Sequence, residues 1–339
     1  MTFQASDLAG FGWSTFFASQ LEPDDAALFP VRVMAVHRDR LQVAGPGIDT
    51  VVPPIAGDEE TAATVGDWLL LDPDMRRPKR LLTRKSLFKR RAAGTGRRIQ
   101  LIAANVDTLF IVSSCNQDFS LARLERYLAL ASEAEVMPVI VLTKADLAGQ
   151  PEDFAREAGG LMPGLLVECL DARDAAGVAR LAPWCGHGQT VALVGSSGVG
   201  KSTLVNTLSG RDIAATQSIR EADDTGQHTT TARALHRLSA GGWLVDTPGM
   251  RELQLTDARS GIEEVFADVV ETASTCRFSD CRHETEPGCA IRAAIESGAM
   301  TPGRVRRWQK LAAEEARNTE SLSERRARDK SFGRMVKRT

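Results

Sequence analysis

The stretch Gly195-Ser-Ser-Gly-Val-Gly-Lys-Ser202 decides the fold of this chain. The apolar, β-branched run Thr190–Val194 comes directly before it, and the helical pattern Thr203–Leu208 follows it. A strand, a glycine-rich loop and a helix in this order are typical of a phosphate-binding loop. An ordinary glycine-rich turn would not need both neighbours, so the stretch predicts a nucleoside-triphosphate site.

Each residue type in this loop has a chemical reason. Glycine has no side chain, which lets backbone N–H groups turn inward around phosphate oxygens, and the helix N-terminus adds further donors. We expect Lys201 to bridge the β- and γ-phosphates and the Ser202 hydroxyl to bind Mg²⁺. The predicted nucleotide contacts from this loop are Gly195, Ser196, Ser197, Gly198, Val199, Gly200, Lys201, Ser202 and Thr203.

The composition is that of a soluble globular protein. The chain has 339 residues, of which 43% are hydrophobic and 25% charged, and its formal net charge is −2. No apolar stretch is long enough to span a bilayer, and Met1–Gln20 lacks the Lys or Arg that begins a signal peptide. Six cysteines without an export signal indicate reduced thiols. We therefore expect a cytoplasmic protein without membrane contact, and a monomer.

Lysine and arginine gather in two segments. Arg76–Arg98 holds eleven basic and no acidic residues, and Arg304–Thr339 holds twelve basic against five acidic residues. Most charge runs are solvated surface, but a segment without a single acid favours a polyanionic partner. We expect that partner to be nucleic acid.

The first hundred residues predict a small barrel after a short helix. Leu8–Leu21 has the apolar spacing of an amphipathic helix, and brief strands with Gly and Pro turns follow it up to about residue 82. We predict an OB-type barrel, which often presents a basic face to RNA, although an SH3-like barrel has the same pattern. Arg84–Arg98 is expected to be an exposed basic connector. The expected strands are Val31–His37, Arg40–Ala44, Thr50–Val52 and Asp67–Leu71.

From residue 100 onward, short apolar runs alternate with helical patterns. Buried β-rich runs separated by helices predict a doubly wound parallel sheet, with the functional loops at the carboxyl ends of its strands. The expected strands are Thr108–Ser113, Val136–Leu142, Leu165–Val167, Val191–Val194 and Gly242–Val245, and the expected helices are Leu121–Ala131, Gly177–Leu181 and Ser202–Leu208.

The tetrapeptide Thr143-Lys-Ala-Asp146 directly follows one of these strands. Its position is that of the [NT]KxD motif, in which Asp146 would accept the ring N–H and the exocyclic amine of guanine while the Lys144 stem packs over the base. Adenine has an acceptor in place of that ring donor, so it would leave a buried Asp146 unpaired. Asp171-Ala172 stands where a supporting Ser-Ala loop is expected, with Asp in place of Ser. The predicted base contacts are Thr143, Lys144, Ala145, Asp146, Asp171 and Ala172.

Two further segments predict the metal and γ-phosphate contacts. Asp246-Thr-Pro-Gly249 follows Gly242–Val245, and we expect Asp246 to hold Mg²⁺ through water and the Gly249 N–H to sense the γ-phosphate. The polar stretch Gly226-Gln-His-Thr-Thr-Thr231 suits a first switch segment. We favour Thr230 over its two threonine neighbours as the residue that completes the Mg²⁺ shell.

The order of these motifs is permuted. Conventional G proteins run from phosphate loop to DxxG to [NT]KxD, whereas here the motif beginning at Thr143 precedes the loop beginning at Gly195. A parallel sheet still closes if the usual termini are joined and the chain is cut after DxxG. The second switch then leads directly into the C-terminal region.

A metal-binding pattern opens that C-terminal region. Cys276, Cys281, His283 and Cys289 provide three thiols and one imidazole within fourteen residues, which fits a tetrahedral zinc site. Four protein ligands leave no open coordination position, so we predict one structural zinc ion per chain. Helical patterns at Ile291–Ser297 and Pro302–Ala316 and the basic tail Arg325–Arg338 follow.

Together these features resemble the RsgA (YjeQ) family of circularly permuted GTPases. The resemblance implies a circularly permuted P-loop GTPase domain with an N-terminal OB-fold β-barrel and a mainly helical, zinc-binding C-terminal domain. It implies hydrolysis of GTP to GDP and phosphate, stimulated by the small ribosomal subunit, late in the maturation of that subunit and through rRNA binding. The expected boundaries are 1–98, 99–258 and 259–339. Thr143 departs from the commoner Asn.

Catalysis is less well specified by the sequence. Met250 follows DTPG and cannot orient a water, so we expect slow intrinsic hydrolysis and large activation by a partner. His228 is the candidate for positioning the water, as the resemblance also suggests, and its alternative is an exposed loop histidine. Two other functions stay open: a P-loop ATPase or kinase with an incidental TKAD, and a zinc-stabilised RNA-binding module whose nucleotide is a structural switch.

Overall fold

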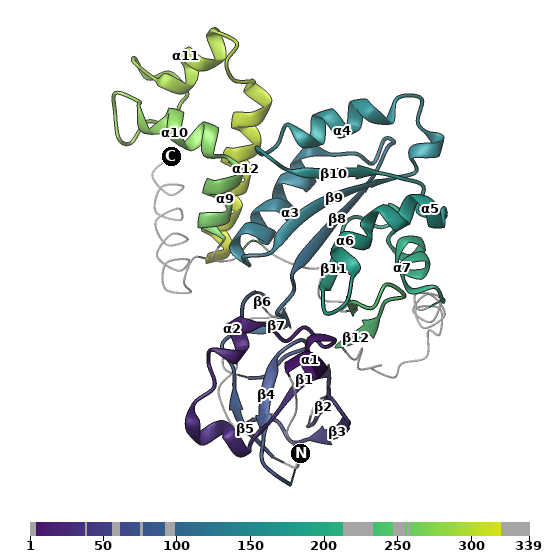
Figure 1. The fold of residues 1–339 in the computed structure, drawn as a ribbon. Helices are drawn as coiled ribbons and strands as arrows, with labels where there is room; N and C mark the ends of the chain where they lie inside the picture. Colours follow the sequence, from purple (N-terminus) through teal and green to yellow (C-terminus); the bar gives the residue numbers. More distant parts are fainter. Residues whose placement is uncertain are drawn as a thin grey trace, which may run out of the picture. The chain divides into compact units, whose positions relative to one another are not determined.

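A computed structural model describes residues 5–37, 39–55, 62–74, 77–91, 99–212, 233–246, 255 and 258–319. The chain forms two compact units, Met1–Leu253 and Gln254–Thr339. The first unit contains a parallel sheet and a small antiparallel barrel, and the second is helical (Figure 1). No helix among the described residues combines the length and the apolar character needed to cross a membrane.

The parallel sheet positions the loops that the sequence analysis singled out. Its strands lie in the order β10-β9-β8-β11-β13-β12, and all neighbouring pairs are parallel except β12 with β13. The side chains of β8 are buried along its whole length, as expected of a central strand covered on both faces. The strands are β8 Thr108–Ser114, β9 Met137–Thr143, β10 Leu166–Cys169, β11 Thr190–Val194, β12 Arg233–Arg237 and β13 Trp243–Asp246.

Helices cover both faces of this sheet. On one face lie α3 (Leu121–Glu133) and α4 (Pro151–Gly159), which contact β8, β9 and β10. On the other, Phe110 and Val112 of β8 pack in one core with side chains from the remaining helices, such as Leu204. Those helices are α5 Ala175–Val178, η3 Ala179–Leu181, α6 Ala182–Cys185 and α7 Lys201–Ser209. The alternation along β8 thus produces the two-sided packing that the sequence predicted.

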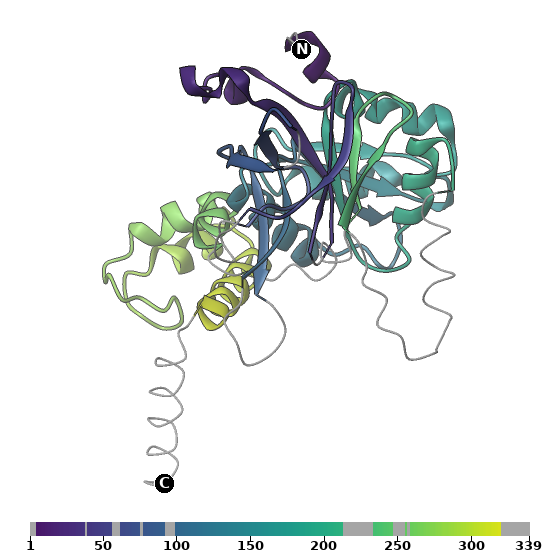
Figure 2. The same ribbon diagram turned by 90° about the horizontal axis from the view of Figure 1, so that it is seen from below.

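The N-terminal barrel joins the parallel sheet through one strand. Strand β1 pairs with β2 and β4 in the barrel, and its end also pairs with β12, so that Ala35 lies opposite Ala234 (Figure 2). The barrel core is apolar, with Val31, Val33 and Leu69 fully buried. The strands are β1 Phe29–Val36, β2 Leu41–Gly45, β3 Ile48–Val52, β4 Trp68–Leu71 and β5 Pro78–Leu81, of which β5 was not predicted.

The predicted exposed connector at residues 84–98 is wrong for its first part. Leu87–Arg91 forms β6, which pairs antiparallel with β7 (Ile99–Ala104). Arg84 donates from Nε to the fully buried Asp67 carboxylate over 2.8 Å. A basic segment that forms a strand and an internal ion pair cannot be wholly solvated. Residues 92–98 of that segment lie outside the described residues.

The predicted single helix at residues 8–21 is also wrong. The segment forms two short helices, α1 (Ala5–Ala9) and α2 (Thr15–Ala18), with a turn between them. Gly12 in that turn has φ +92°, and a Cβ there would lie 2.8 Å from the Gly188 carbonyl oxygen. Only glycine fits this conformation and this close approach, and the chain therefore cannot continue as one helix.

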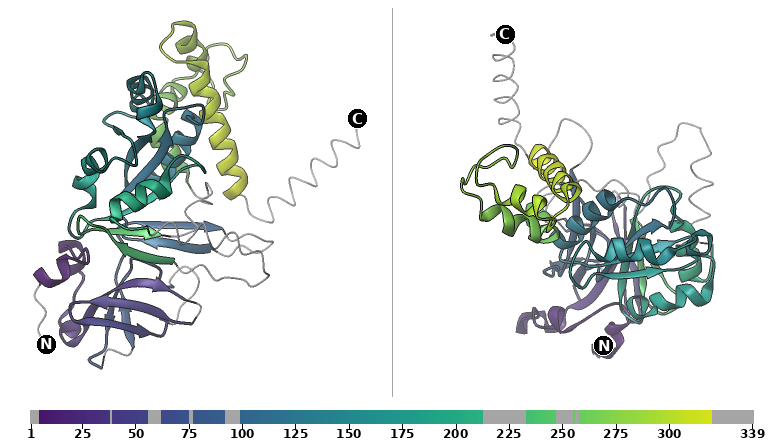
Figure 3. Two further views of the ribbon diagram at one scale, coloured as in Figure 1. Left: turned by 90° about the vertical axis from the view of Figure 1, so that its right-hand side faces the viewer. Right: turned by 90° about the horizontal axis from the view of Figure 1, so that it is seen from above.

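The C-terminal unit consists of short helices and one long one. The predicted helices after Cys289 are present as α11 (Ala290–Glu296) and α12 (Pro302–Thr319), and α12 is the long yellow helix in Figure 3. Two helices that were not predicted, α9 (Arg259–Val265) and α10 (Ala267–Ser274), precede the cysteines. The basic tail 325–338 lies outside the described residues.

Candidate functional site

The glycine-rich loop begins where β11 ends. Gly195 has φ +147°, and a Cβ there would lie 2.2 Å from the Val112 carbonyl oxygen of β8. Gly200 has φ +92° and lies against the Thr143 side chain, which a Cβ would approach to 3.3 Å. These two positions have different close neighbours, the β8 backbone for Gly195 and the last side chain of β9 for Gly200. The loop is therefore fixed by the sheet beneath it.

A cavity of about 480 Å³ lies over this loop. Lys201, the first residue of α7, donates from Nζ to the carbonyl oxygens of Gly195 (2.8 Å) and Ser196. Backbone N–H groups at a helix start together with a lysine ammonium suit a polyphosphate. The lining residues are Tyr127, Gly195, Ser196, Ser197, Gly198, Gly200, Lys201, Ser202 and Thr203.

Thr143 ties the TKAD motif to the glycine-rich loop. Its side chain is fully buried, and its hydroxyl lies 2.5 Å from the Val199 carbonyl oxygen and 3.1 Å from that of Ser113. The single hydroxyl proton serves one of these carbonyls at a time. The next residue, Lys144, has φ 57°, a left-handed conformation that is uncommon for a residue with a side chain. Thr143 thus connects the glycine-rich loop to the TKAD motif, the two segments that are predicted to contact the nucleotide.

Asp146 lies opposite the loop that contains Asp171 and Ala172. The Arg173 guanidinium joins the two, with Nη2 at 2.8 Å from Asp146 Oδ2 and Nε at 3.0 Å from Asp171 Oδ1. The hydrogen bond from Arg173 lowers the pKa of Asp171 below its usual range. Ala172 is buried, and its carbonyl accepts the Thr207 hydroxyl of α7 at 2.7 Å. The predicted base contacts are therefore gathered at one edge of the sheet, on two loops held by neighbouring elements.

Two residues of α3 that were not predicted reach the cavity over the glycine-rich loop. Arg123 donates from Nη1 to Ser196 Oγ over 2.9 Å, and Tyr127 lines the cavity. Burial raises the pKa of Tyr127 above its usual value. Their i, i+4 spacing on a helix directly after a central strand is the only signal that could have indicated them.

The predicted catalytic residues are described only in part. Asp246 is the last residue of β13, and because Val245 lies opposite Ala192 of β11, its backbone reaches the same edge as Gly195. His228, Thr230 and Gly249 lie outside the described residues. Their roles stay predictions.

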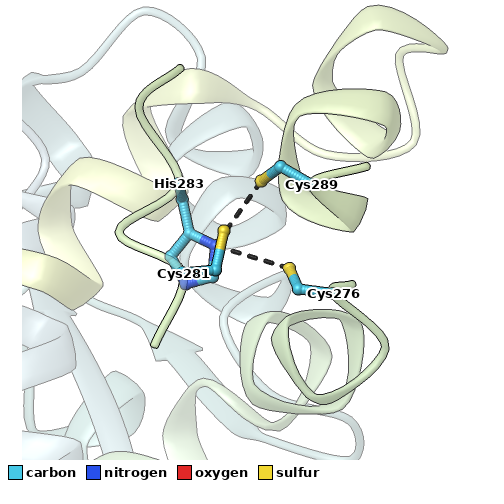
Figure 4. A group of neighbouring side chains, drawn as sticks. All are labelled: Cys276, Cys281, His283 and Cys289. Atoms are coloured by element: carbon cyan, nitrogen blue, oxygen red, sulfur yellow. Dashed lines mark hydrogen bonds between the residues drawn. The ribbon is translucent and has the colours of Figure 1, made fainter. Parts of the chain in front are cut away.

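The four predicted metal ligands lie together in the C-terminal unit (Figure 4). Their ligand atoms are all within 4.8 Å of one another, and His283 Nδ1 is 3.6 Å from both Cys276 Sγ and Cys289 Sγ. Zinc bonds of about 2.3 Å to sulfur and about 2.0 Å to nitrogen in a tetrahedron place such atoms about 3.5 Å apart. Cys276, Cys281, His283 and Cys289 therefore fit a closed tetrahedral metal site.

The loop between the last two ligands is shaped by a carboxylate. Glu286 accepts backbone N–H groups from Arg282 at 2.9 Å, Glu284 at 2.9 Å and Thr285 at 3.0 Å. These hydrogen bonds, of which the one from the Arg282 N–H contributes most, lower the pKa of Glu286 to about 2. The turn that presents His283 is thus held by hydrogen bonds to an ionised side chain.

Known proteins with similar sequences show the family of this chain. The sequence profile of the RsgA GTPase family matches residues 81–256. A protein of Mesorhizobium japonicum named small ribosomal subunit biogenesis GTPase RsgA is 50% identical over 100% of this chain and 98% of its own. One of Vibrio parahaemolyticus, named small ribosomal subunit biogenesis GTPase RsgA 2, is 48% identical over 98% of this chain and 92% of its own.

Solved structures share the fold. YjeQ from Thermotoga maritima matches with a TM-score of 0.63 and 24% identity, over 84% of this chain and 97% of its own. YloQ, described as a circularly permuted GTPase, matches with a TM-score of 0.59 and 22% identity, over 89% of this chain and 100% of its own. The predicted permuted GTPase fold is confirmed.

Proposed function

The chain belongs to the RsgA GTPase family and is a GTP hydrolase, and on that premise we propose that it acts in late assembly of the small ribosomal subunit. In this proposal the subunit stimulates hydrolysis of GTP to GDP and phosphate, and the chain binds the subunit through rRNA. The relatives' names supply the subunit, the family supplies the reaction, and the geometry of the glycine-rich loop supports a triphosphate as substrate.

One observation carries the proposal. A loop suited to phosphate and a carboxylate suited to guanine are joined by Thr143, whose hydroxyl contacts the Val199 carbonyl of the phosphate loop. Asp146 lies three residues after Thr143 in the sequence. If the phosphates of a nucleotide bind at Lys201, its base would lie near Asp146, because Thr143 connects the loop that carries Asp146 to the phosphate loop.

Guanine is the base that suits this pocket. An ionised Asp146 only accepts hydrogen bonds, and guanine offers two adjacent donors, the ring N–H and the exocyclic amine. Adenine places an acceptor beside its amine, so one carboxylate oxygen would face a lone pair. The Ala172 loop and the Lys144 stem are proposed to form the walls around the base.

The metal and water contacts are part of the proposal. Ser202, Thr230 and Asp246 are the proposed Mg²⁺ ligands, the last through water, and bound Mg²⁺ would neutralise charge on the phosphates. The Gly249 N–H would contact the γ-phosphate, and His228 would orient the attacking water. Since Met250 cannot do so, we expect slow hydrolysis without the subunit.

We propose a structural zinc ion at the cluster of Cys276, Cys281, His283 and Cys289. Three thiolates and one imidazole are soft, nitrogen- and sulfur-rich ligands of the kind that zinc prefers. A four-ligand site has no position for substrate, so zinc would stabilise the C-terminal unit and take no part in hydrolysis.

The basic segments are the proposed contacts with rRNA. Arg76–Arg98 contains no acid, although its Arg84 is paired with the buried Asp67 and is not part of the proposed contact, and Arg304–Thr339 carries an excess of basic residues. Phosphate contacts release counterions, so binding should weaken as salt rises. A monomer in the cytoplasm is the state in which we expect this binding to occur.

Phosphate release from GTP, with and without purified small subunits, tests the proposal. We expect stimulation of about a thousandfold or more, within the range that partner-supplied groups give to GTPases, and a decline with added salt. His228→Ala should keep GDP affinity and lose most of the stimulated rate. ATP hydrolysis equal to GTP hydrolysis would instead indicate a P-loop ATPase, and subunit binding without any hydrolysis would indicate an RNA-binding module.

A further inference from the structure

Arg173 forms hydrogen bonds with Asp146 and Asp171, which lie on separate loops at the edge of the sheet where the base contacts are predicted. Its Nη2 donates to Asp146 Oδ2 at 2.8 Å and to Asp171 Oδ2 at 3.1 Å, and its Nε donates to Asp171 Oδ1 at 3.0 Å. Asp146 follows β9 and Asp171 follows β10, and these strands pair so that Leu142 lies opposite Cys169. The guanidinium therefore links residues that are distant in sequence and adjacent in the sheet.

These hydrogen bonds involve three of the five guanidinium N–H groups. The side with Nε–H and one Nη2–H pairs with both oxygens of Asp171, a bidentate arrangement that fixes the plane of the guanidinium. The second Nη2–H is then directed to Asp146. A lysine ammonium is a point charge and cannot hold one carboxylate in two bonds while pointing a third donor at another.

Arg173 is itself held by its loop. Its backbone N–H donates to Asp171 Oδ1 at 3.0 Å, and the Asp174 N–H donates to the Asp171 carbonyl oxygen at 3.1 Å. The carbonyl of Ala172 accepts the Thr207 hydroxyl of α7. This loop is thus anchored to the helix that begins at the phosphate loop, so its arginine presents a donor from a defined place.

We propose that Arg173 is a positioning residue for guanine recognition, which orients the Asp146 carboxylate and takes its own position from Asp171. One lone pair of Asp146 Oδ2 accepts Arg173, and a carboxylate has further lone pairs on both oxygens for two parallel N–H groups of guanine. The proposal gives a role to Asp171, the residue that departs from the expected Ser. It rests on the proposed guanine site.

An exposed ion pair without functional consequence is the competing explanation. The Arg173 side chain is 67% exposed and that of Asp146 31% exposed, and such pairs contribute little to folding stability. The two explanations differ in what they change. A surface ion pair alters neither stability nor base choice, whereas a positioning residue alters base choice and leaves the thermal midpoint of unfolding nearly constant.

Affinities of the full-length chain for GDP and IDP, measured by calorimetric titration with Mg²⁺, test the proposal. IDP keeps the ring N–H and lacks the exocyclic amine, so the GDP:IDP affinity ratio reports how well Asp146 accepts both donors. We expect Arg173→Ala to weaken GDP binding about tenfold and IDP binding about threefold or less, as for coupled contacts in one network. Arg173→Lys should give an intermediate ratio.

Controls separate the role of Arg173 from general effects. Arg156→Ala removes another exposed arginine that pairs with an aspartate, in α4, and should leave both affinities unchanged. In an Asp146→Ala background, Arg173→Ala should have no further effect on the ratio, because its partner is gone. An unchanged GDP:IDP ratio in Arg173→Ala, or tighter GDP binding, would overturn the proposal. Failure of the wild-type chain to bind GDP at all would overturn the guanine site itself.

Discussion

The proposed nucleotide pocket and the Cys/His cluster are both formed by loops, but different interactions hold those loops in place. Beside the glycine-rich loop, Thr143, Val194 and Val199 are at most 1% exposed, so packed strands fix the backbone there. In residues 275–289, all of which the structure describes, Cys289 alone is buried. Packing cannot define that loop, so we expect a bound metal to hold it together with the hydrogen bonds to Glu286. Functional geometry can therefore come from a hydrophobic core or from a metal, and the two should fail under different perturbations.

Removal of zinc should have the largest effect and should be confined to the C-terminal unit. Structural zinc binding supplies about 10 kcal/mol in small metal sites, so Cys276→Ser should lose the metal and the cooperative unfolding of that unit. Zinc content and thermal unfolding by circular dichroism measure this. GDP affinity should stay within about twofold, since the pocket has its own core. Cys169→Ser, a thiol outside the cluster, should keep the zinc, and loss of GDP binding in Cys276→Ser would contradict the separation of the two regions.

Lys201→Ala should have the next largest effect and should be confined to the pocket. Loss of a charged hydrogen-bond donor to phosphate costs about 3 kcal/mol, which corresponds to more than about a hundredfold in GTP affinity. Equilibrium titration with GTP measures the loss, and zinc content should be unchanged. The control is Lys310→Ala on α12. A variant at Lys201 that binds GTP like the wild type would show that the cavity is not the phosphate site.

Asp146→Asn should change the preferred base. The Asn amide can donate an N–H to the O2 atom of xanthine and accept the xanthine ring N–H at its carbonyl oxygen, whereas guanine presents two donors to it. We expect GDP affinity to fall by about 2 kcal/mol and XDP affinity to rise, as competition titrations would record. Asp153→Asn in α4 serves as the control. If GDP and XDP keep their original order, Asp146 does not contact the base.

Thr143→Val should have the smallest effect, since it removes one hydroxyl and keeps the side-chain shape. The Val199 or Ser113 carbonyl then loses its donor, which costs about 1 kcal/mol and about fivefold in GDP affinity. Thr272→Val, at a threonine that donates to the Asp268 carbonyl in the C-terminal unit, should leave the affinity unchanged. Equal effects of the two variants in the same titration would argue against a special link at Thr143.

The elements that the sequence predicted are those defined over a short distance along the chain. The glycine-rich loop, the TKAD motif and the four metal ligands each lie within one short segment, and their spacing carries the chemistry. The strands of the parallel sheet were predicted because runs such as Thr108–Ser113 are rich in apolar and β-branched residues. The family prediction rested on the order of these segments, and it is confirmed.

What the sequence did not predict depends on contacts between distant residues. Arg173 meets Asp146 only because β9 and β10 pair in one register. Arg84 was predicted to lie in an exposed segment, but it pairs with Asp67, which lies seventeen residues earlier in the chain. The N-terminal helix is interrupted because Gly12 meets Gly188, a neighbour that no local pattern indicates. Arg123 and Tyr127 belong to no motif, and only the packing of α3 brings them to the phosphate loop.

A crystal structure of the chain with GDP and Mg²⁺ would show whether Asp146 contacts the base. We expect the guanine ring N–H and exocyclic amine to lie within about 3 Å of the Asp146 carboxylate, with the phosphates at Lys201 and Ser202. A base bound away from Asp146, or an adenine nucleotide seated in the same pocket with equal occupancy, would contradict it.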